Sequence, residues 1–496
     1  MRRRQPGPQT IAGTLCLRVS APPAYNPPAN RGKRINPDEG RIRVTAPDTH
    51  PAPSAGPAGE AVSAQPAKRL RSVGRAWRAL RHRNYRLFFA GQGISLIGTW
   101  MQRIALSWLV YRLTGSALLL GVVGFVGQVP ILALAPLAGV LADRWSLRRV
   151  LVLTQVVALV QAALLAVLTA TGMITYGQLL VLAIALGVIN AFDMPVRQAF
   201  VVEMVDRPED LGNAIALNSF LVNGAQLLGP ALAGVLIATV GEALCFSLNA
   251  VSYFAVIAAL AAMRVSRRPS PPVGVPLFRG LAEGFSYGFG FPPIRDVLLL
   301  LALCSLMGMS YGTVMPLFAG DVLQGGPQAL GFLLGATGFG AIFGAMYLAS
   351  RPSVLGLGRI IATGAAMFGL GLIGVAFTRS LWTAVPFMFL AGTGMMLHIA
   401  SSNTVLQTIV DDDKRGRVMS LYTMAFVGMM PFGSLLAGAL AHVVGVPLTL
   451  AIGGGCCLAG GVVFAGRLRT LRPLVQPIYL RKGILLPAPI PPNPGP

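Results

Sequence analysis

The sequence is poor in charged and titratable side chains. Only 11% of its 496 residues are charged, and the 17 Asp and Glu are far outnumbered by 40 Lys and Arg. A soluble chain normally carries about a quarter charged residues, whereas 54% of the side chains here are hydrophobic. A single water-soluble globule is therefore excluded.

Motifs of common enzymes and metal sites are also missing. There is no G-x-x-x-x-G-K-[ST] loop, so the chain does not bind ATP as a P-loop pump does. There is no H-E-x-x-H, and the four His are scattered along the chain. The five Cys form no C-x-x-C, and we expect buried, reduced thiols. The sequence predicts no enzyme, no metal site and no cofactor.

The N-terminal segment differs in composition from the rest. Residues 1–83 hold 16 of the 40 cations and only four acids, with much Pro and Ala and no apolar periodicity. Such a segment buries too little surface to fold alone, and it has no aromatic platform for bases. We predict a disordered basic cytoplasmic tail that binds no nucleic acid.

Long apolar runs fill the remainder of the chain. A helix that crosses a bilayer needs about 20 mainly apolar residues, and twelve runs of this kind follow Tyr85. The sequence predicts an all-α integral membrane protein with twelve transmembrane helices, at 86–111, 117–141, 149–171, 176–196, 213–240, 243–263, 296–319, 329–349, 358–378, 382–404, 417–440 and 446–466.

The loops divide the chain and orient it. We predict an N-terminal six-helix half (84–263), a cytoplasmic linker (264–295), a C-terminal six-helix half (296–466) and a cytoplasmic C-terminal tail (467–496). Arginines occur in alternate loops, whereas the opposite loops hold only Arg112 and Arg379. Cytoplasmic loops collect Lys and Arg, so both termini are expected in the cytoplasm. Arg outnumbers Lys by 36 to 4, which favours a GC-rich bacterial genome and the bacterial plasma (inner) membrane.

The two halves are related by an internal duplication. A shift of 204 residues places 212–241 on 416–445 with ten identities in 30 positions, including Gly234 on Gly438. A shift of 210 places Gly121 on Gly331. Two six-helix halves in the same orientation form a parallel repeat, an arrangement used by transporters that rock one bundle against the other.

A loop motif follows the second span. It reads Gly139-Val-Leu-Ala-Asp143-Arg144-Trp-Ser-Leu-Arg148-Arg149. Gly allows close helix approach, and the carboxylate can meet a helix N-terminus or an Arg across the interface between the halves. The string resembles the signature G-x-x-x-D-R-x-G-R-R of the major facilitator superfamily, with Ser146 at the second Gly. The segments 98–102, 108–116 and 415–420 are similar to the branch that contains enterobactin-type siderophore exporters.

The resemblance implies the major facilitator fold and alternating access. In the fifth span, Gly229, Pro230 and Gly234 are similar to an antiporter motif that this family associates with export, although Ala replaces three of its glycines. The family's antiporter Arg in span four is absent, since 176–189 has no charge. The alternative role for the glycines is ordinary helix packing.

Gly139 and nine charged residues near the loops are candidates for a conformational latch. These are Gly139, Asp143, Arg144, Arg148, Arg149, Asp193, Arg197, Asp411, Arg415 and Arg417. Asp193 is placed to pair with Arg144 or Arg148 at the cytoplasmic gate, or locally with Arg197 one turn away.

Polar residues inside the spans are candidates for the substrate cavity, because each is costly there. They are Thr99, Gln102, Arg103, Asn190, Tyr311 and His398. Arg103 is suited to an anionic substrate or a neighbouring carboxylate, or else it snorkels to the outer interface. His398 either titrates near neutral pH or bonds to Ser401 or Ser402.

Together these features predict a proton-driven exporter of small lipophilic organic molecules, such as drugs, siderophores or metabolites. The expected partners are the substrate, protons and the lipid bilayer, and the expected state is a monomer. Two alternatives stay open: an uptake transporter of the same fold, and a transporter-shaped receptor or regulatory protein.

Overall fold

The computed structural model describes residues 78–205, 207–264, 277–351 and 353–485; within them the side chains of 135–144, 208 and 277–282 are not described. These residues all belong to one compact unit, 64–496. Most of the predicted basic tail, residues 1–77, lies outside the described residues.

The first half consists of six long helices. After a short 3-10 turn, η1 (Arg78–Arg81), they are α2 (Arg83–Thr114), α3 (Ala117–Arg144), α4 (Leu147–Ala170), α5 (Tyr176–Met204), α6 (Leu211–Thr239) and α7 (Glu242–Ala262), with the 3-10 turn η2 (Pro208–Asp210) before α6. The start of α5 is fixed by a capping box in which Thr175 and Gln178 satisfy each other's backbone N–H groups.

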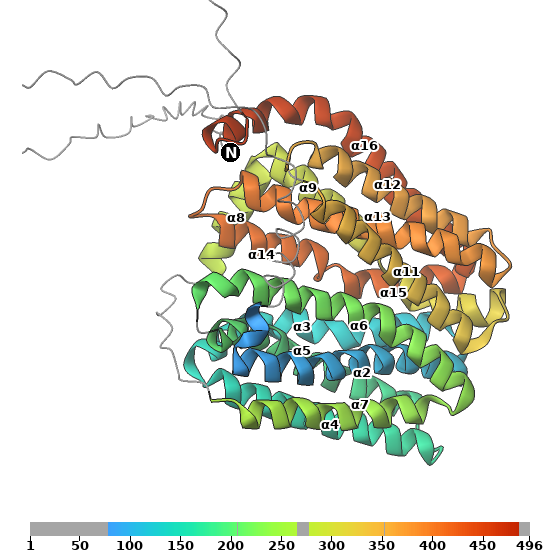
Figure 1. The fold of residues 1–496 in the computed structure, drawn as a ribbon. Coiled ribbons are helices and arrows are strands. Elements are labelled where there is room, and N and C mark those ends of the chain that lie inside the picture. Colours follow the sequence, from blue (N-terminus) through green and yellow to red (C-terminus); the bar gives the residue numbers. More distant parts are fainter. Residues whose placement is uncertain (1–77, 206, 265–276, 352, 486–496) are drawn as a thin grey trace, which may run out of the picture. The chain divides into compact units, whose positions relative to one another are not determined.

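The second half begins with a short helix, α8 (Leu277–Gly290), inside the predicted linker. It continues with α9 (Pro292–Leu303), η3 (Cys304–Gly308), α10 (Tyr311–Leu317), η4 (Phe318–Val322), α11 (Gly326–Ala349), α12 (Leu357–Ala376), α13 (Leu381–Ile409), α14 (Arg415–Phe426), α15 (Met430–Val444) and α16 (Val446–Arg481). Figure 1 shows α2–α7, in blue to green, gathered on one side and α9–α16, in yellow to red, on the other.

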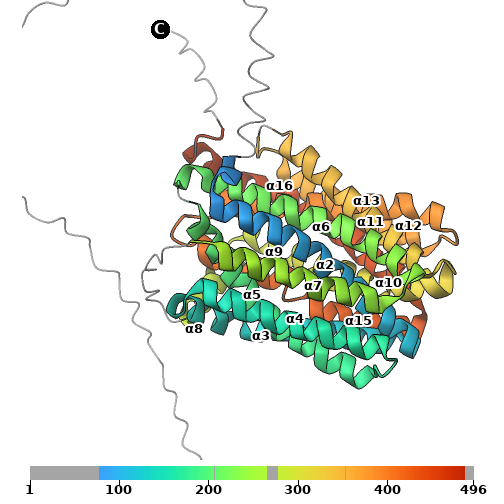
Figure 2. The same ribbon diagram turned by 60° about the horizontal axis from the view of Figure 1, so that its bottom comes forward.

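The predicted all-α membrane fold is confirmed. Among the described residues, eleven helical stretches are long and apolar enough to cross a membrane. The remaining crossing is α2, which is 32 residues long and carries more polar side chains than the others, among them Gln92, Ser95, Gln102 and Arg103. The described helices thus make twelve crossings, and Figure 2 shows them running side by side.

Two spans that the sequence predicts as continuous are broken. The seventh runs from Pro292 to Val322 and contains the π-helical segments η3 and η4, and the eleventh is interrupted at 427–429 between α14 and α15. The Ser305 hydroxyl donates a hydrogen bond to the Phe426 carbonyl at the end of α14, an oxygen left without a helical partner by the interruption. A continuous apolar run carries no signal for such breaks.

The last span is also longer than predicted. Helix α16 does not end at residue 466 but continues to Arg481, past the predicted start of the C-terminal tail. Its end is held by Lys482, whose ammonium donates to the carbonyls of Thr408 (2.8 Å) and Val410 (3.2 Å) at the end of α13. A cation at a helix C-terminus is electrostatically favourable.

The two halves meet through glycines. A Cβ on Gly234 in α6 would lie 2.9 Å from the Cα of Gly331 in α11, and a Cβ on Gly438 in α15 would lie 2.7 Å from the Cα of Gly121 in α3. These two crossings are the pairs that the shifts of 204 and 210 residues relate to each other. The duplicated glycines therefore lie where the halves touch.

Packing between the halves is concentrated toward one end of the bundle. We call the end that holds Arg83 and Arg481 the near end and the opposite end the far end. One cluster of buried side chains draws on both halves, and its members, such as Val110, Val314 and Phe318, lie toward the far end. Toward the near end each half has its own core, around Phe200 in the first and Leu406 in the second.

Closure of the far end should depend on the glycine crossings. In Gly234→Val the added side chain clashes with the α11 backbone, so the halves are forced apart there. We expect a cysteine at position 314, where Val314 is 0% exposed, to become reactive toward a polar maleimide in a chain otherwise free of cysteine. Gly224→Val is the control, because a Cβ at Gly224 has no neighbour within 4 Å. Equal protection in both variants would contradict the assignment.

Candidate transport site

Some helices contact the other half toward the far end, and the same face of each helix is exposed toward the near end. On α6, Leu227 and Ala216 lie 7 and 18 residues before Gly234, on the same face of the helix. A Cβ at Gly338 would lie 2.9 Å from the Leu227 Cα, so Leu227 is still packed on α11. Ala216 and the nearby Ser219 are exposed.

The second half repeats this arrangement. Ser420 and Thr423 on α14 correspond to Ala216 and Ser219 under the shift of 204 residues, and both are exposed. Farther along the same span, toward the far end, Gly438 on α15 is packed on α3. Small and polar side chains of both halves are therefore exposed toward the near end, on helix faces that are packed against the other half farther along.

Among the described residues, a single side-chain hydrogen bond connects the two halves. The Tyr111 hydroxyl at the end of α2 donates to Asp321 Oδ1 in η4 at 2.5 Å. The phenol can come this close because Gly320 has no side chain; a Cβ there would lie 2.2 Å from the Tyr111 oxygen. The sequence did not reveal this pair, because periodicity within one helix does not identify partners on another.

Uncharged polar groups form a network inside the first half. Gln102 on α2 donates to Gln161 on α4 (3.0 Å) and accepts from the Asn249 amide on α7 (2.7 Å). Ser252 in turn donates to the Asn249 side chain at 3.1 Å. The predicted cavity residue Gln102 is thus 1% exposed and ties three helices together. Gln161 was missed, although it is an amide in an otherwise apolar span.

Asp193 on α5 is the centre of a second buried cluster. Its Oδ1 accepts hydrogen bonds from Thr154 (3.0 Å) and Gln155 (2.7 Å) on α4. Its Oδ2 lies 3.6 Å from the Arg197 Nε, so the local pair is present. Arg148 instead donates to the Ala261 carbonyl at 2.9 Å. The partners on α4 were missed because Thr and Gln carry no charge that would mark them in the sequence.

The other latch candidates in the first half are only partly described. Gly139, Asp143 and Arg144 belong to the end of α3, and their side chains lie outside the described residues. Arg149 is exposed at the start of α4.

The latch candidates of the second half bind within that half. Asp411 pairs with Arg481 of α16 (3.1 Å) and accepts from the Tyr287 hydroxyl of α8 (3.3 Å). Burial raises the pKa of the Tyr287 phenol, and the charge of Asp411 raises it further, so the phenol stays protonated as a donor. Arg415 pairs with Asp412, and Arg417 pairs with Glu283 of α8 at 2.8 Å.

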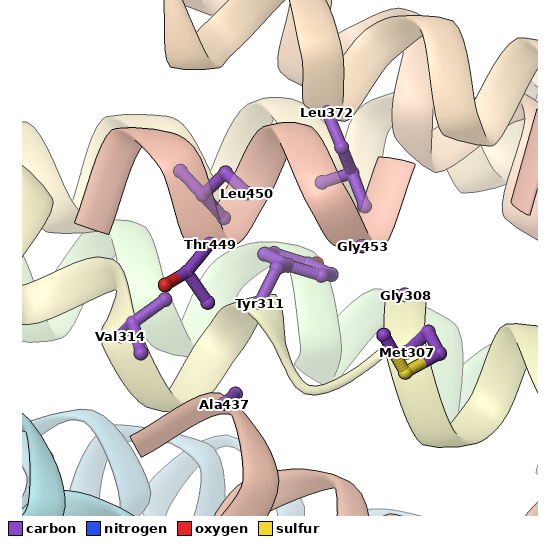
Figure 3. A pocket seen from close by; sticks show the side chains of 9 residues that line it. All are labelled: Met307, Gly308, Tyr311, Val314, Leu372, Ala437, Thr449, Leu450 and Gly453. Carbon is purple, nitrogen blue, oxygen red and sulfur yellow. The ribbon is translucent and has the colours of Figure 1, made fainter. Parts of the chain in front are cut away.

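The remaining cavity candidates form no hydrogen bonds with one another among the described residues. Thr99 donates to the Ser95 carbonyl at 2.9 Å, Asn190 is half-buried one turn before Asp193, and Arg103 is exposed. Tyr311 lines a small cavity with room for about one water molecule, between α10, α12, α15 and α16, with Thr449 and Leu450 also in its wall (Figure 3). Ligand pockets usually take about 300–1,000 Å³, so this space is small for a whole substrate.

His398 on α13 is 1% exposed. Its Nδ1 lies 3.4 Å from the Ile361 carbonyl, whereas Nε2 has no hydrogen-bond partner. The hydroxyls of Ser401 and Ser402 are also unpaired. The expected hydrogen bond from His398 to one of these serines is not formed, because the ring faces α12.

A family model described as a transmembrane secretion effector matches residues 74–474. The chain belongs to this family of the major facilitator superfamily. It is similar to the staphyloferrin A transporter of Staphylococcus aureus, with 28% identity over 74% of this chain and 92% of the relative. It is 26% identical to the multidrug efflux pump Tap of Mycolicibacterium fortuitum, over 77% and 94% of the two chains. It is also 26% identical to the enterobactin exporter EntS of Shigella boydii, over 72% and 85%.

Solved structures support the fold. The chain superposes on a bacterial homologue of the lysosomal transporter Spinster with a TM-score of 0.60 and 14% identity, over 82% of this chain and 99% of that one. A peptide transporter, POT, gives a TM-score of 0.61 and 14% identity, over 79% and 95% of the chains. The protein is a multi-pass membrane transporter of the major facilitator type, as the resemblance implies.

The buried Asp193 cluster should stabilise the first half. Asp193→Ala leaves the Arg197 charge and the buried Gln155 amide without their acceptor, whereas Thr154 can still donate to the Leu151 carbonyl at 2.9 Å. Breaking a buried pair costs about 3–5 kcal/mol. Because Arg197 is 22% exposed, we expect the low end of this range, measured as a lower Tm of the purified protein. Asp412→Ala is the control, since its side chain is 84% exposed and such pairs contribute about 0–1 kcal/mol. Equal losses in the two variants would refute the role of the cluster.

Proposed function

We propose that the protein is a secondary active exporter of small, largely lipophilic organic molecules that works by alternating access. The observation that supports the proposal is the dense packing of the two halves toward the far end, with exposed polar faces at Ser219 and Thr423 toward the near end. A transporter that rocks its halves about a central site alternates between two such arrangements. The efflux-related names of the relatives favour export.

The orientation of the bundle follows from its arginines. The near-end loops and termini carry most of the cations, whereas the far-end loops hold Arg112 and Arg379. By the positive-inside rule the near end is cytoplasmic, so this is an inward-open state in the bacterial inner membrane, with both termini in the cytoplasm. We expect a monomer, because each chain has both halves of the repeat.

The proton gradient is the proposed driving force. Four described carboxylates are buried, and three of them (Asp210, Glu242 and Asp296) lie at or near helix ends. Asp193 instead lies inside α5, 11 residues before the helix ends at Met204, and is the carboxyl best placed to exchange a proton within a span. One proton moved across 100 mV supplies about 2.3 kcal/mol, enough for about a fiftyfold gradient.

The loop motif supplies a conformational latch in this proposal. Asp143, with Arg144, Arg148 and Arg149, would hold the cytoplasmic ends of the halves together in the outward-open state and release them in the inward-open state. An uptake transporter of the same fold would use the same latch, so the direction of transport needs its own measurement.

Asp143→Asn should abolish transport without preventing membrane insertion, because the amide keeps the shape of the carboxylate but not its charge. The test is substrate-induced collapse of the pH gradient in inverted vesicles, with a panel of lipophilic dyes and one siderophore. Asp412→Asn is the control. Full residual flux in Asp143→Asn would rule out the latch.

A chain that lacks residues 1–75 separates transport from a receptor function. A transporter should still move its substrate, because the deleted residues precede the first described helix. A receptor that signals through the basic tail should lose its output. Loss of all transport in the shortened, correctly inserted chain would favour the receptor alternative.

A further inference from the structure

Arg103 faces the interior of the bundle. It lies nine residues after Ile94, about two and a half helical turns, so the two side chains leave α2 on opposite faces. Ile94 is 57% exposed on the outer face. Two glycine contacts fix this orientation: Gly229 places α6, and Gly98 places α7, on either side of the outer face.

The interior position of Arg103 is nevertheless exposed. Val110, two turns farther along the same face, is 0% exposed and packs in the far-end cluster with Val314 and Phe318. Arg103 itself is exposed, although it lies 11 residues before the end of α2 at Thr114. The guanidinium therefore lies beside the packed far-end cluster and is not enclosed by it.

An aromatic side chain holds the guanidinium in place. The Arg103 Cζ lies 5.2 Å from the ring centre of Trp100, within the range of a cation–π contact. Trp100 is itself fixed against α6, because a Cβ at Gly229 would lie only 2.4 Å from the Trp100 Cβ. The site thus presents an oriented cation beside an indole ring.

No described carboxylate neutralises this cation. Within the far half of the bundle, Glu242 pairs with Arg112 at 2.9 Å and Asp321 accepts from Tyr111. Asp193 pairs with Arg197. The neighbouring Gln102 is engaged with Gln161 and Asn249. An unmatched charge inside a span is costly and usually marks a substrate or ion path.

We propose that Arg103 and Trp100 bind the anionic group of the exported substrate, and that the preferred substrates are amphipathic aromatic acids. A guanidinium is suited to a carboxylate because its planar donors match both oxygens. The adjoining Trp100 ring and apolar wall take the aromatic part. This inference rests on the proposed export function and names its substrate class.

A negative charge on the substrate also contributes to the driving force. An inside-negative membrane potential moves an anion outward, and for one charge at 100 mV this corresponds to about a fiftyfold gradient. Export of an organic anion therefore needs fewer exchanged protons than export of a cation. This agrees with the shortage of carboxylates inside the described spans, where Asp193 alone lies far from a helix end.

The test compares acids with neutral molecules of the same shape. Binding of salicylate and salicylamide, and of 1-naphthoate and 1-naphthamide, is measured by calorimetry on the purified full chain in lipid nanodiscs. We expect at least one acid to bind about tenfold or more tightly than its amide, a difference of about 1.4 kcal/mol. Arg103→Gln should remove this preference, and Arg103→Lys should retain part of it.

Arg86→Gln is the matched control, because Arg86 is an exposed cation at the near end of the same helix. It should keep the full preference. The inference is overturned if the unaltered protein does not prefer either acid, or if the preference survives in Arg103→Gln. Loss of transport in vesicles with an intact acid preference would overturn the export function but not the site. If the protein transports neutral dyes but does not bind acids more tightly than their amides, the Arg103 site is overturned and the export function is not.

Discussion

The close contact of glycine with glycine across the two halves is the constraint on which the rest of the structure depends. Lipid tails are as apolar as the helix surfaces, so no hydrophobic force drives these helices together. Their association depends on backbones that approach closely at Gly121 and Gly438 and at Gly234 and Gly331. Because both contacts lie toward the far end, that end is packed and the near end is free to separate.

The two halves differ in how they can respond when these contacts break. In the first, Gln102, Gln161 and Asn249 tie α2, α4 and α7 together, which favours movement as one rigid body. In the second, the breaks in the seventh and eleventh spans adjoin through Ser305 and Phe426. Broken helices are common at the binding sites of transporters. Local adjustment is therefore more readily accommodated in the second half.

Sequence patterns predicted the features that repeat along the chain. The lengths of the apolar runs predicted the transmembrane spans. The internal duplication pointed to the glycines that form the contacts between the halves, Gly121, Gly234, Gly331 and Gly438. Patterns within one helix could not identify partners on another, so Thr154 and Gln155 beside Asp193 and the pair Tyr111–Asp321 were missed. The helix breaks were missed because they depend on tertiary contacts.

Arg103 illustrates how contacts between helices bear on two interpretations that the sequence left open. Val110, two turns farther along the same face of α2, is packed in one cluster with Val314 and Phe318 of span seven, which argues against snorkelling to the outer interface. The guanidinium contacts Trp100. In the proposed site, this cation would attract anions from the near end, and closure of the near end around a bound acid would neutralise it. The proposal therefore couples substrate charge and conformational change through the same residue.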